Sequence, residues 1–332
     1  MRARFDPSRL GRWSWALISL VLILLFDLIF TPKFFSVELR DGHYFGSLID
    51  ILNRGAPVML IALGMTLVIA TGGVDLSVGA TMAIVGSIAA QVVTKSHPSV
   101  VVVLLVCLGI ALLLGTWNGI LVAVFKIQPI VATLILMVSG RGIAQLITDG
   151  QIISFGDKAL SFIGSGYLFR VPFSITLVLV MLGLTALLTR RTAIGLFIES
   201  VGDNATASRY AGIDVRTVQL FVYAFCGFCA GVAGLVATTN MRAADANNTG
   251  LNLELDAILA VVIGGTLLTG GRFQLVGSIL GALVIQALTT TILTKGVPIE
   301  YTLVVKALTV LAVCLLQSAK FRGKFRFKAR VA

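Results

Sequence analysis

Nine apolar runs, each about as long as a lipid bilayer is thick, leave few folds open to this sequence. A membrane-spanning helix needs about 20 predominantly apolar residues. The runs cover residues 14–30, 52–70, 77–94, 100–125, 129–148, 173–189, 218–240, 274–294 and 301–318. Overall, 57% of the residues are hydrophobic and only 12% are charged, whereas soluble domains carry about 25% charged residues. The sequence therefore predicts an all-α polytopic membrane protein.

A tenth apolar stretch, residues 257–271, is shorter and is interrupted by glycine pairs. By itself it is either a full span or a re-entrant segment. Basic residues of short segments stay on the cytoplasmic side of a membrane, and both ends of the chain are rich in Lys and Arg. We therefore expect the N-terminus and the C-terminus in the cytoplasm, which requires an even number of spans. About ten transmembrane helices is the economical prediction.

The positive charge of the chain follows from this orientation. With ten spans, the inward segments hold 16 of the 26 Lys and Arg residues, and the outward segments hold 7. The formal net charge of +11 is thus an orientation signal, and we exclude nucleic acid as a partner. The predicted organisation is a basic cytoplasmic N-terminus (1–13), a transmembrane domain (14–318) and a basic cytoplasmic tail (319–332).

The longest inward segment, residues 190–217, is too long for a plain connection, because helices are usually joined by a few residues. It is compatible with a helix between Glu199 and Ala211, before Gly212, and it contains several apolar side chains. A solvated linker is the plain alternative, but such linkers are more polar. We predict that this segment docks a cytoplasmic partner.

Polar residues in and between the spans are the best candidates for a substrate pathway, because unpaired polar groups are costly in lipid. Asp75 lies among glycines in Thr71–Ala80, where it either caps the following helix or belongs to a broken helix that lines a polar path. Neutral side chains that could meet a neutral solute or join helices are Asn118, Gln145, Asn240 and Gln286. Three charged residues near span ends are expected to snorkel or pair, namely Asp27, Arg141 and Lys306.

The outward segment 241–256 is polar and rich in amides and carboxylates. Such side chains suit a hydroxyl-rich ligand, but the same composition fits a surface loop or a docking rim. Glycine pairs at four-residue spacing, Gly227 with Gly231 and Gly277 with Gly281, predict close helix packing.

The sequence contains neither an energy source nor a catalytic centre of its own. Asp27 is the single acidic residue within the predicted spans, and the nearest approach to a phosphate loop, residues 265–272, lacks the required lysine. The four cysteines lie in apolar runs, so we expect them to pack helices. We predict no catalytic residue, no cofactor and no metal site, and we expect that a partner supplies ATP if the protein pumps.

Four sequence blocks resemble the permease subunits of bacterial monosaccharide ABC importers of the ribose type. They are GMTLVIATGGVDLSVGA (64–80), PIVATLILMVSGRG (129–142), AGIDVRT (211–217) and ELDAILAVVIGGTLLTGGRF (254–273). The similarity covers about residues 50–318. Within this group, GSLIDILNRGAPV (46–58), WNGILVAVFKIQPIVATLILM (117–137) and RAADANNTGLNLELDAILAVVIGG (242–265) are most similar to the permeases of galactofuranose importers.

The resemblance implies a transport subunit, not an enzyme, in the bacterial inner membrane. The implied partners are a cytoplasmic ATPase subunit, a periplasmic sugar-binding protein and a second permease, either a different chain or another copy. It also implies a coupling helix around Glu199–Asp214 that inserts into the ATPase, with the candidate residues Glu199, Gly202, Asp203, Ala207 and Gly212.

Two alternatives to galactofuranose import stay open. One is a permease of the same family with another cargo, a ribose-like sugar or a branched-chain amino acid. The other is an integral membrane enzyme, which would need clustered acidic or histidine residues near an interface. The scarcity of charge in the spans, with only two histidines in the chain, disfavours the amino acid and the enzyme.

Overall fold

The computed structural model describes residues 13–31, 34–40, 42–96, 98–296, 298 and 300–317. Within these residues, seven helices are long and apolar enough to cross a membrane. They are α2 (Ser47–Ala70), α3 (Val78–Ser96), α4 (Val100–Ala123), α5 (Pro129–Thr148), α7 (Phe173–Arg191), α10 (Val215–Met241) and α12 (Leu275–Thr294). The prediction of a helical, multi-pass membrane protein is thereby confirmed.

Three further predicted spans correspond to α1 (Ser14–Phe30), α13 (Glu300–Gln317) and α11 (Leu253–Ile263). The helix α11 has 11 residues, which at 1.5 Å per residue is about 16 Å, or half of a hydrocarbon core of about 30 Å. The tenth stretch is therefore not one continuous spanning helix. The count of ten spans and the sidedness of the termini stay predictions, and most of the basic end segments lie outside the described residues.

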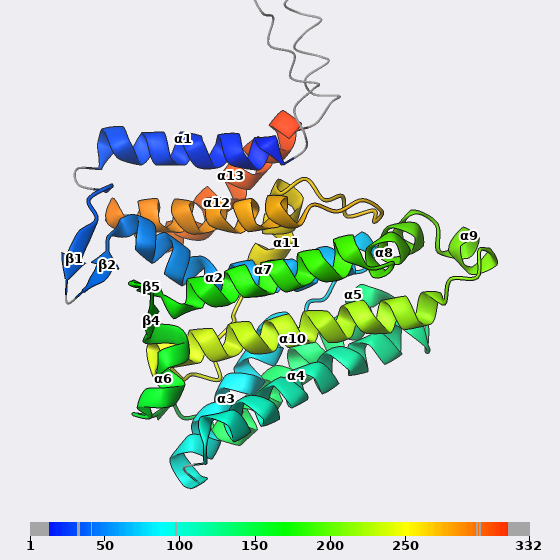
Figure 1. Ribbon diagram of the computed structural model, residues 1–332, viewed down its shortest axis with the longest axis horizontal. Coiled ribbons are helices and arrows are strands. Elements are labelled where there is room, and N and C mark those ends of the chain that lie inside the picture. Colours follow the sequence, from blue (N-terminus) through cyan, green and yellow to red (C-terminus); the bar gives the residue numbers. More distant parts are fainter. Residues whose placement is uncertain are drawn as a thin grey trace, which may run out of the picture.

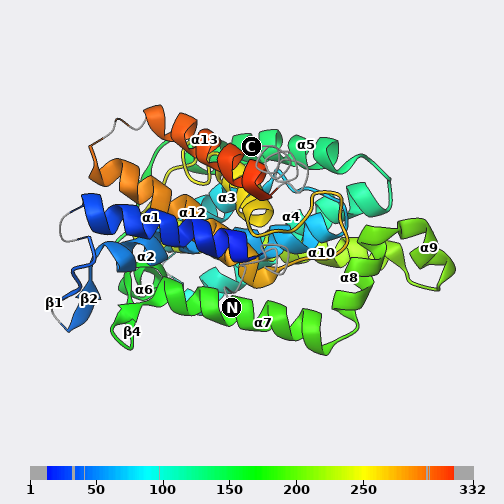
Figure 2. The ribbon, with the colours of Figure 1, turned by 90° about the horizontal axis from the view of Figure 1, so that it is seen from above.

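The helices form an inner and an outer group. The most apolar windows of α2, α3 and α10 are 78%, 72% and 72% buried, whereas those of α4, α5 and α7 are 22%, 28% and 28% buried. Figure 2 shows α5 and α7 on opposite flanks of the bundle. Because α2, α3 and α10 are the buried helices, polar groups on them are shielded from lipid.

Glycine allows two helix pairs to approach backbone to backbone. A Cβ atom on Gly227 of α10 would lie 2.5 Å from the carbonyl oxygen of Ala111 in α4. A Cβ atom on Gly281 of α12 would lie 2.0 Å from the carbonyl oxygen of Ala260 in α11. The close packing predicted from the paired glycines is confirmed.

The remaining elements lie at the two ends of the bundle (Figure 1). At one end are the antiparallel hairpins β1–β2 and β4–β5, with the helix α6. At the other end are α8 and α9. Their bounds are β1 (Glu38–Arg40), β2 (His43–Phe45), β4 (Tyr167–Leu168), β5 (Val171–Pro172), α6 (Lys158–Ser165), α8 (Ile194–Asp203) and α9 (Ala205–Tyr210). A third antiparallel pair joins β3 (Ile153–Ser154) to β6 (Ala243–Ala244).

The cysteines Cys107, Cys226 and Cys229 are buried and unpaired. They pack within the main core, as expected from their apolar surroundings. No group of His, Cys, Asp and Glu side chains among the described residues could hold a metal ion.

Candidate functional site

The chain between α2 and α3 forms a buried polar break. Helix α2 ends at Ala70, and α3 begins at Val78. In the intervening segment, one carboxylate oxygen of Asp75 accepts hydrogen bonds from the backbone N–H of Ser77 at 2.9 Å and from its hydroxyl at 2.7 Å. The carboxylate thus organises the turn that leads into α3, and its donor Ser77 lies directly before the first helical residue, Val78.

Helices α4 and α10 close over this break. The amide of Asn118 in α4 donates to the Asp75 carboxylate at 3.3 Å and to the Ser77 hydroxyl at 2.7 Å. From α10, the hydroxyl of Tyr223 donates to the carbonyl of Val74 at 3.5 Å. Asp75 is 1% exposed and Asn118 is fully buried, so the break is a shielded joint between four helices, α2, α3, α4 and α10, in this conformation.

Of the five residues predicted to line a substrate pathway, only Asp75 and Asn118 are hydrogen-bonded to each other. Gln145 of α5 donates to the side chain of Asn247 at 2.7 Å, and Asn240 is exposed near the end of α10. Gln286 of α12 donates to Thr290 at 3.4 Å. The structure therefore distributes these five residues over separate clusters.

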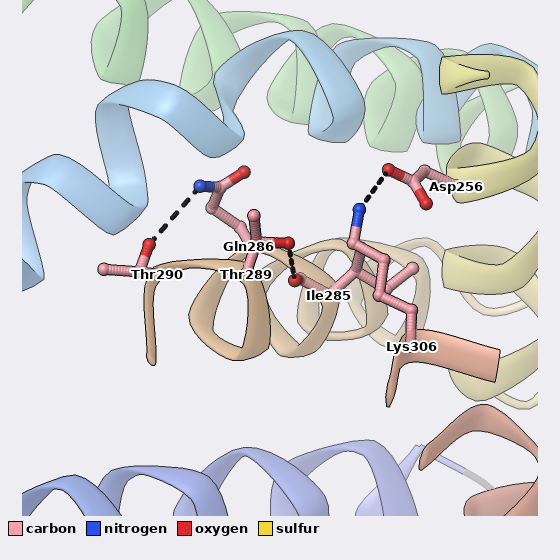
Figure 3. Close-up of polar contacts among 6 residues, drawn as sticks. All are labelled: Asp256, Ile285, Gln286, Thr289, Thr290 and Lys306. Atoms are coloured by element: carbon pink, nitrogen blue, oxygen red, sulfur yellow. Dashed lines mark hydrogen bonds and ion pairs between the residues drawn. The ribbon is translucent and has the colours of Figure 1, made fainter. Parts of the chain in front are cut away.

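Gln286 of α12 lies beside an ion pair that joins α11 to α13 (Figure 3). Lys306 of α13 forms an ion pair with Asp256 of α11, at 2.9 Å between Nζ and Oδ2. Both side chains are 15% exposed. The expectation that Lys306 would pair is confirmed.

Gln286 itself packs against α2. Gly55 of α2 leaves room for it, because a Cβ atom at position 55 would be 3.3 Å from the Cβ atom of Gln286.

This ion pair should behave as one unit when it is mutated. Lys306→Met leaves the Asp256 carboxylate without its partner, so we expect a loss of about 2 kcal/mol, between the values typical of exposed and buried pairs. The double variant with Asp256→Ala should lose less than the sum of the two single losses. Thermal denaturation of the purified protein in detergent measures all three, and strictly additive losses would contradict the pairing.

Arg141 of α5 was expected either to snorkel or to pair with an acidic group. In the structure it donates hydrogen bonds to the backbone of another segment. One guanidinium nitrogen donates to the carbonyl oxygens of Ala246 at 3.0 Å and of Thr249 at 2.6 Å. Both acceptors belong to the polar segment between α10 and α11. A lone arginine in an apolar helix was the available signal, but backbone acceptors have no signature in the sequence.

The same segment has an internal turn organised by Asp245. Its carboxylate accepts hydrogen bonds from the backbone N–H groups of Asn247 at 2.9 Å and Asn248 at 3.2 Å, and from the Asn248 amide at 2.7 Å. Partial burial raises the pKa of this carboxyl, but the hydrogen bonds from Asn248 and Asn247 and the charge of Arg141 bring the pKa below its usual value. The turn is therefore built around a charged carboxylate.

The predicted coupling segment forms two short helices instead of one. The helix expected between Glu199 and Ala211 is interrupted after Asp203, because Asn204 adopts an extended backbone and its side chain caps α9 by accepting from the N–H of Ala207 at 2.9 Å. Asparagine is a preferred N-cap residue. The prediction of one continuous helix was wrong. Helix α8 lies against the bundle, whereas α9 is mostly exposed.

The α9 end of this segment projects away from the bundle. Tyr210 is 89% exposed, Ala207 is exposed, and Gly212 ends the helix with a positive φ of 86°. Asp214 caps α10 and accepts a hydrogen bond from the Thr217 hydroxyl at 2.6 Å, which lowers the pKa of its carboxyl. Glu199 is partly buried on α8, while Asp203 is exposed.

Gly202, near the end of α8, lies against the bundle. A Cβ atom there would be 1.7 Å from the carbonyl oxygen of Ala70, the last residue of α2, and 2.4 Å from the backbone nitrogen of Gly271. Gly271 itself donates to the Ala70 carbonyl at 2.8 Å. The backbone of α8 is therefore in direct contact with the chain that leads into the Asp75 break.

Comparison with known proteins identifies the family. A family model described as the branched-chain amino acid transport system permease component matches residues 47–314. The chain belongs to this permease family. The match covers every helix from α2 to α12 and therefore includes the polar break, the coupling segment and the Arg141 contact.

The relatives of this permease include sugar importers. It is 54% identical to the galactofuranose transporter permease protein YtfT of Escherichia coli over 95% of this chain and 93% of the relative. It is 39% identical to the fructose import permease protein FruF of Bifidobacterium longum, over 93% and 88%. It is 36% identical to the ribose import permease protein RbsC of Haemophilus influenzae, over 95% and 97%. No solved structure gives a significant match.

These relatives are transport permease subunits of ABC sugar importers. The resemblance read from the sequence blocks is therefore confirmed, and this permease is a multi-pass membrane protein of the same kind. The polar clusters are accordingly interpreted as parts of a transport protein.

Proposed function

We propose that this permease carries galactofuranose into a bacterial cell across the inner membrane. The observation that carries the proposal is the 54% identity to a galactofuranose transporter permease over nearly the whole chain. The fructose and ribose permeases are 39% and 36% identical. A ribose-like sugar is the second candidate cargo, and the scarcity of charge in the spans disfavours a branched-chain amino acid.

In this proposal, a partner ATPase binds the exposed α8–α9 segment. Closure of the ATPase moves α8, and Gly202 transmits the movement to the backbone at Ala70 and Gly271, with which it is in contact. Asp75 lies five residues after Ala70 in the polar break. The movement therefore reaches the joint between α2, α3, α4 and α10. The residues Glu199, Asp203, Ala207 and Gly212 belong to the same coupling segment.

The sugar enters from the opposite end of the bundle, where a periplasmic sugar-binding protein delivers it. We assign Asp75, Asn118, Gln145, Asn240 and Gln286 as candidate residues of the polar route. Amide and carboxylate side chains suit sugar hydroxyls because they donate and accept hydrogen bonds. The buried Asp75–Asn118 joint would have to open during transport.

Reconstitution tests the assignment of cargo. The permease is placed in proteoliposomes with the ATPase, the second permease and the binding protein that its neighbouring genes encode, and uptake of labelled galactofuranose and ribose is compared. We expect ATP-dependent galactofuranose uptake at least tenfold above that of ribose. If ribose were taken up faster than galactofuranose, ribose would be the cargo instead. If neither sugar were taken up, import of these monosaccharides would be refuted.

The permease alone should hydrolyse no ATP. Catalysis belongs to the partner chain in this proposal, so the purified permease should release phosphate at the rate of empty liposomes, whereas the full complex should hydrolyse ATP. A phosphate-release assay on both preparations measures this. Hydrolysis by the permease alone, retained after a second purification step, would count against a pure transport subunit.

A second permease chain completes the pathway in the proposed assembly. The galactofuranose system is expected to use a different permease, with a homodimer as the alternative. Co-expression of two differently tagged copies of this chain with the neighbouring permease distinguishes the two arrangements. Recovery of the neighbouring permease, but not of the second tagged copy, is the expected result.

A further inference from the structure

The segment that joins α10 to α11, residues 243–252, folds into the bundle instead of standing clear of it. It starts with β6, which pairs with β3, at the end of the bundle opposite α8 and α9. From there it reaches the first turn of α3, where a Cβ atom on Gly79 would be 2.3 Å from the carbonyl oxygen of Gly250. We refer to residues 243–252 as the inserted segment.

The inserted segment therefore rests on the helix that begins at the polar break. Gly79 lies two residues after Ser77, whose hydroxyl donates to Asp75. Gly250 has a positive φ of 74°, which allows its backbone to turn against Gly79. The inserted segment covers the start of α3 from the end opposite the coupling helices.

Helix α5 holds the inserted segment in this position through two side chains. Arg141 donates to the carbonyl oxygens of Ala246 and Thr249, and Gln145, one turn further along, donates to Asn247. Hydrogen bonds from a charged donor are stronger than those between neutral groups. One face of α5 packs on α3, where a Cβ atom on Gly140 would be 3.1 Å from the Cβ atom of Ala80, and its other faces are mostly exposed at the flank of the bundle.

One group of the inserted segment is not satisfied in this position. The hydroxyl of Thr249 is buried and has no hydrogen-bond partner. A buried unsatisfied hydroxyl costs about 1–3 kcal/mol, and this cost disappears when the segment moves to a solvated position. The closed position is thus held by Arg141 and opposed by Thr249.

We propose that the inserted segment is the outward gate of the permease and that Arg141 is the positioning residue that keeps it closed. The proposal rests on the proposed import function. For sugar to reach the Asp75–Asn118 joint from the outward side, the two Arg141 hydrogen bonds break and the inserted segment withdraws from Gly79. A change in the contacts of α5 then opens the gate without unfolding any helix.

A reversible cross-link tests the movement. Gln145→Cys and Asn247→Cys are combined, and a short bis-methanethiosulfonate reagent joins the two thiols across the existing contact. Because Gln145 is itself a candidate residue of the polar route, uptake is compared with that of the same double variant before cross-linking. We expect at least a tenfold fall in ATP-dependent sugar uptake after cross-linking and a return to that variant's own rate after reduction with dithiothreitol. Each single variant treated with the reagent is the control, and recovery on reduction shows that the double variant is folded.

Unchanged uptake in the fully cross-linked complex would overturn the gate. Failure of the proposed function has a different signature, because an unmodified complex that takes up no monosaccharide fails before any cross-link is made. A measurement that needs no transport covers that case. It uses the variant Thr249→Cys, because a cysteine side chain is similar in size to a threonine side chain. The measured quantity is the rate at which a maleimide labels the new thiol. The labelling of the native cysteines in the unaltered chain is subtracted.

The labelling rate depends on Arg141 if this residue holds the gate. Combined with Thr249→Cys, Arg141→Ala should raise the labelling rate at least tenfold, and Arg141→Lys, which retains a charged donor, should restore most of the protection. The matched control is Ser139→Ala, an exposed residue of α5 whose hydroxyl bonds only within its own helix. Equal labelling in the alanine and lysine variants, or no increase at all, would refute the role of Arg141.

Discussion

Gly202→Ala is expected to abolish sugar uptake while the protein still inserts and folds. The new methyl group would have to occupy a point 1.7 Å from the Ala70 carbonyl oxygen and 2.4 Å from the Gly271 nitrogen. Both are backbone atoms, which cannot rotate away as the end of a side chain can. Helix α8 must therefore shift away from α2, and the proposed link between the coupling segment and the polar break is lost.

The measurement is uptake by the reconstituted complex, together with the rate of ATP hydrolysis. We expect uptake to fall at least tenfold, with ATP hydrolysis and assembly of the complex changed less than twofold. Gly183→Ala in α7 is the matched control, because nothing lies within 4 Å of a Cβ atom at that position. Normal uptake by Gly202→Ala would refute the link, and loss of assembly would make Gly202 a docking residue instead.

Asp75→Ala is expected to destabilise the protein strongly and to stop transport. The substitution removes the acceptor of three donors, the N–H and the hydroxyl of Ser77 and the amide of Asn118. An unsatisfied buried donor costs about 1–3 kcal/mol, although the Ser77 hydroxyl and the Asn118 amide can still bond to each other. We therefore expect a loss of about 3 kcal/mol in the free energy of unfolding.

Thermal unfolding in detergent and uptake in proteoliposomes measure the two effects. Asp50→Ala is the matched control, because Asp50 is an exposed carboxylate on the same helix, α2. Asp75→Asn, which keeps an acceptor oxygen, should recover part of the stability. If Asp75→Ala were as stable and as active as Asp50→Ala, the polar break would have no structural role.

The sequence was sufficient to predict the long helices and the closest helix contacts. Apolar runs of bilayer length have almost no alternative to helices, because lipid offers no hydrogen bonds to an open backbone. Gly227 and Gly281 were correctly identified as close contacts from their spacing alone. For Asp75 the sequence left two roles open, a helix cap and a place in a broken helix that lines a polar path. The structure places its carboxylate in the turn before α3, bonded to Ser77, and the polar path stays a prediction.

The positions of the connecting segments could not be predicted in the same way. The inserted segment is held by backbone carbonyl oxygens at Ala246 and Thr249, and every residue carries such an oxygen. Gly202 contacts a helix more than 130 residues earlier in the chain. The break at Asn204 does have a signal in the sequence, because asparagine is a preferred N-cap residue and it follows Gly202 and Asp203, which are weak helix formers.

The backbone contact between α10 and α4 limits which parts of the permease can move. Gly227 lies directly against the backbone of Ala111 and Gly115, so no side chain separates the two helices at this point. Interfaces packed this closely rearrange in discrete steps and do not slide gradually. The two helices should therefore travel as one rigid body throughout the transport cycle. Their amide hydrogens along this seam should be among the slowest to exchange with deuterium, while α5, α8 and α9 should exchange at rates that change with nucleotide.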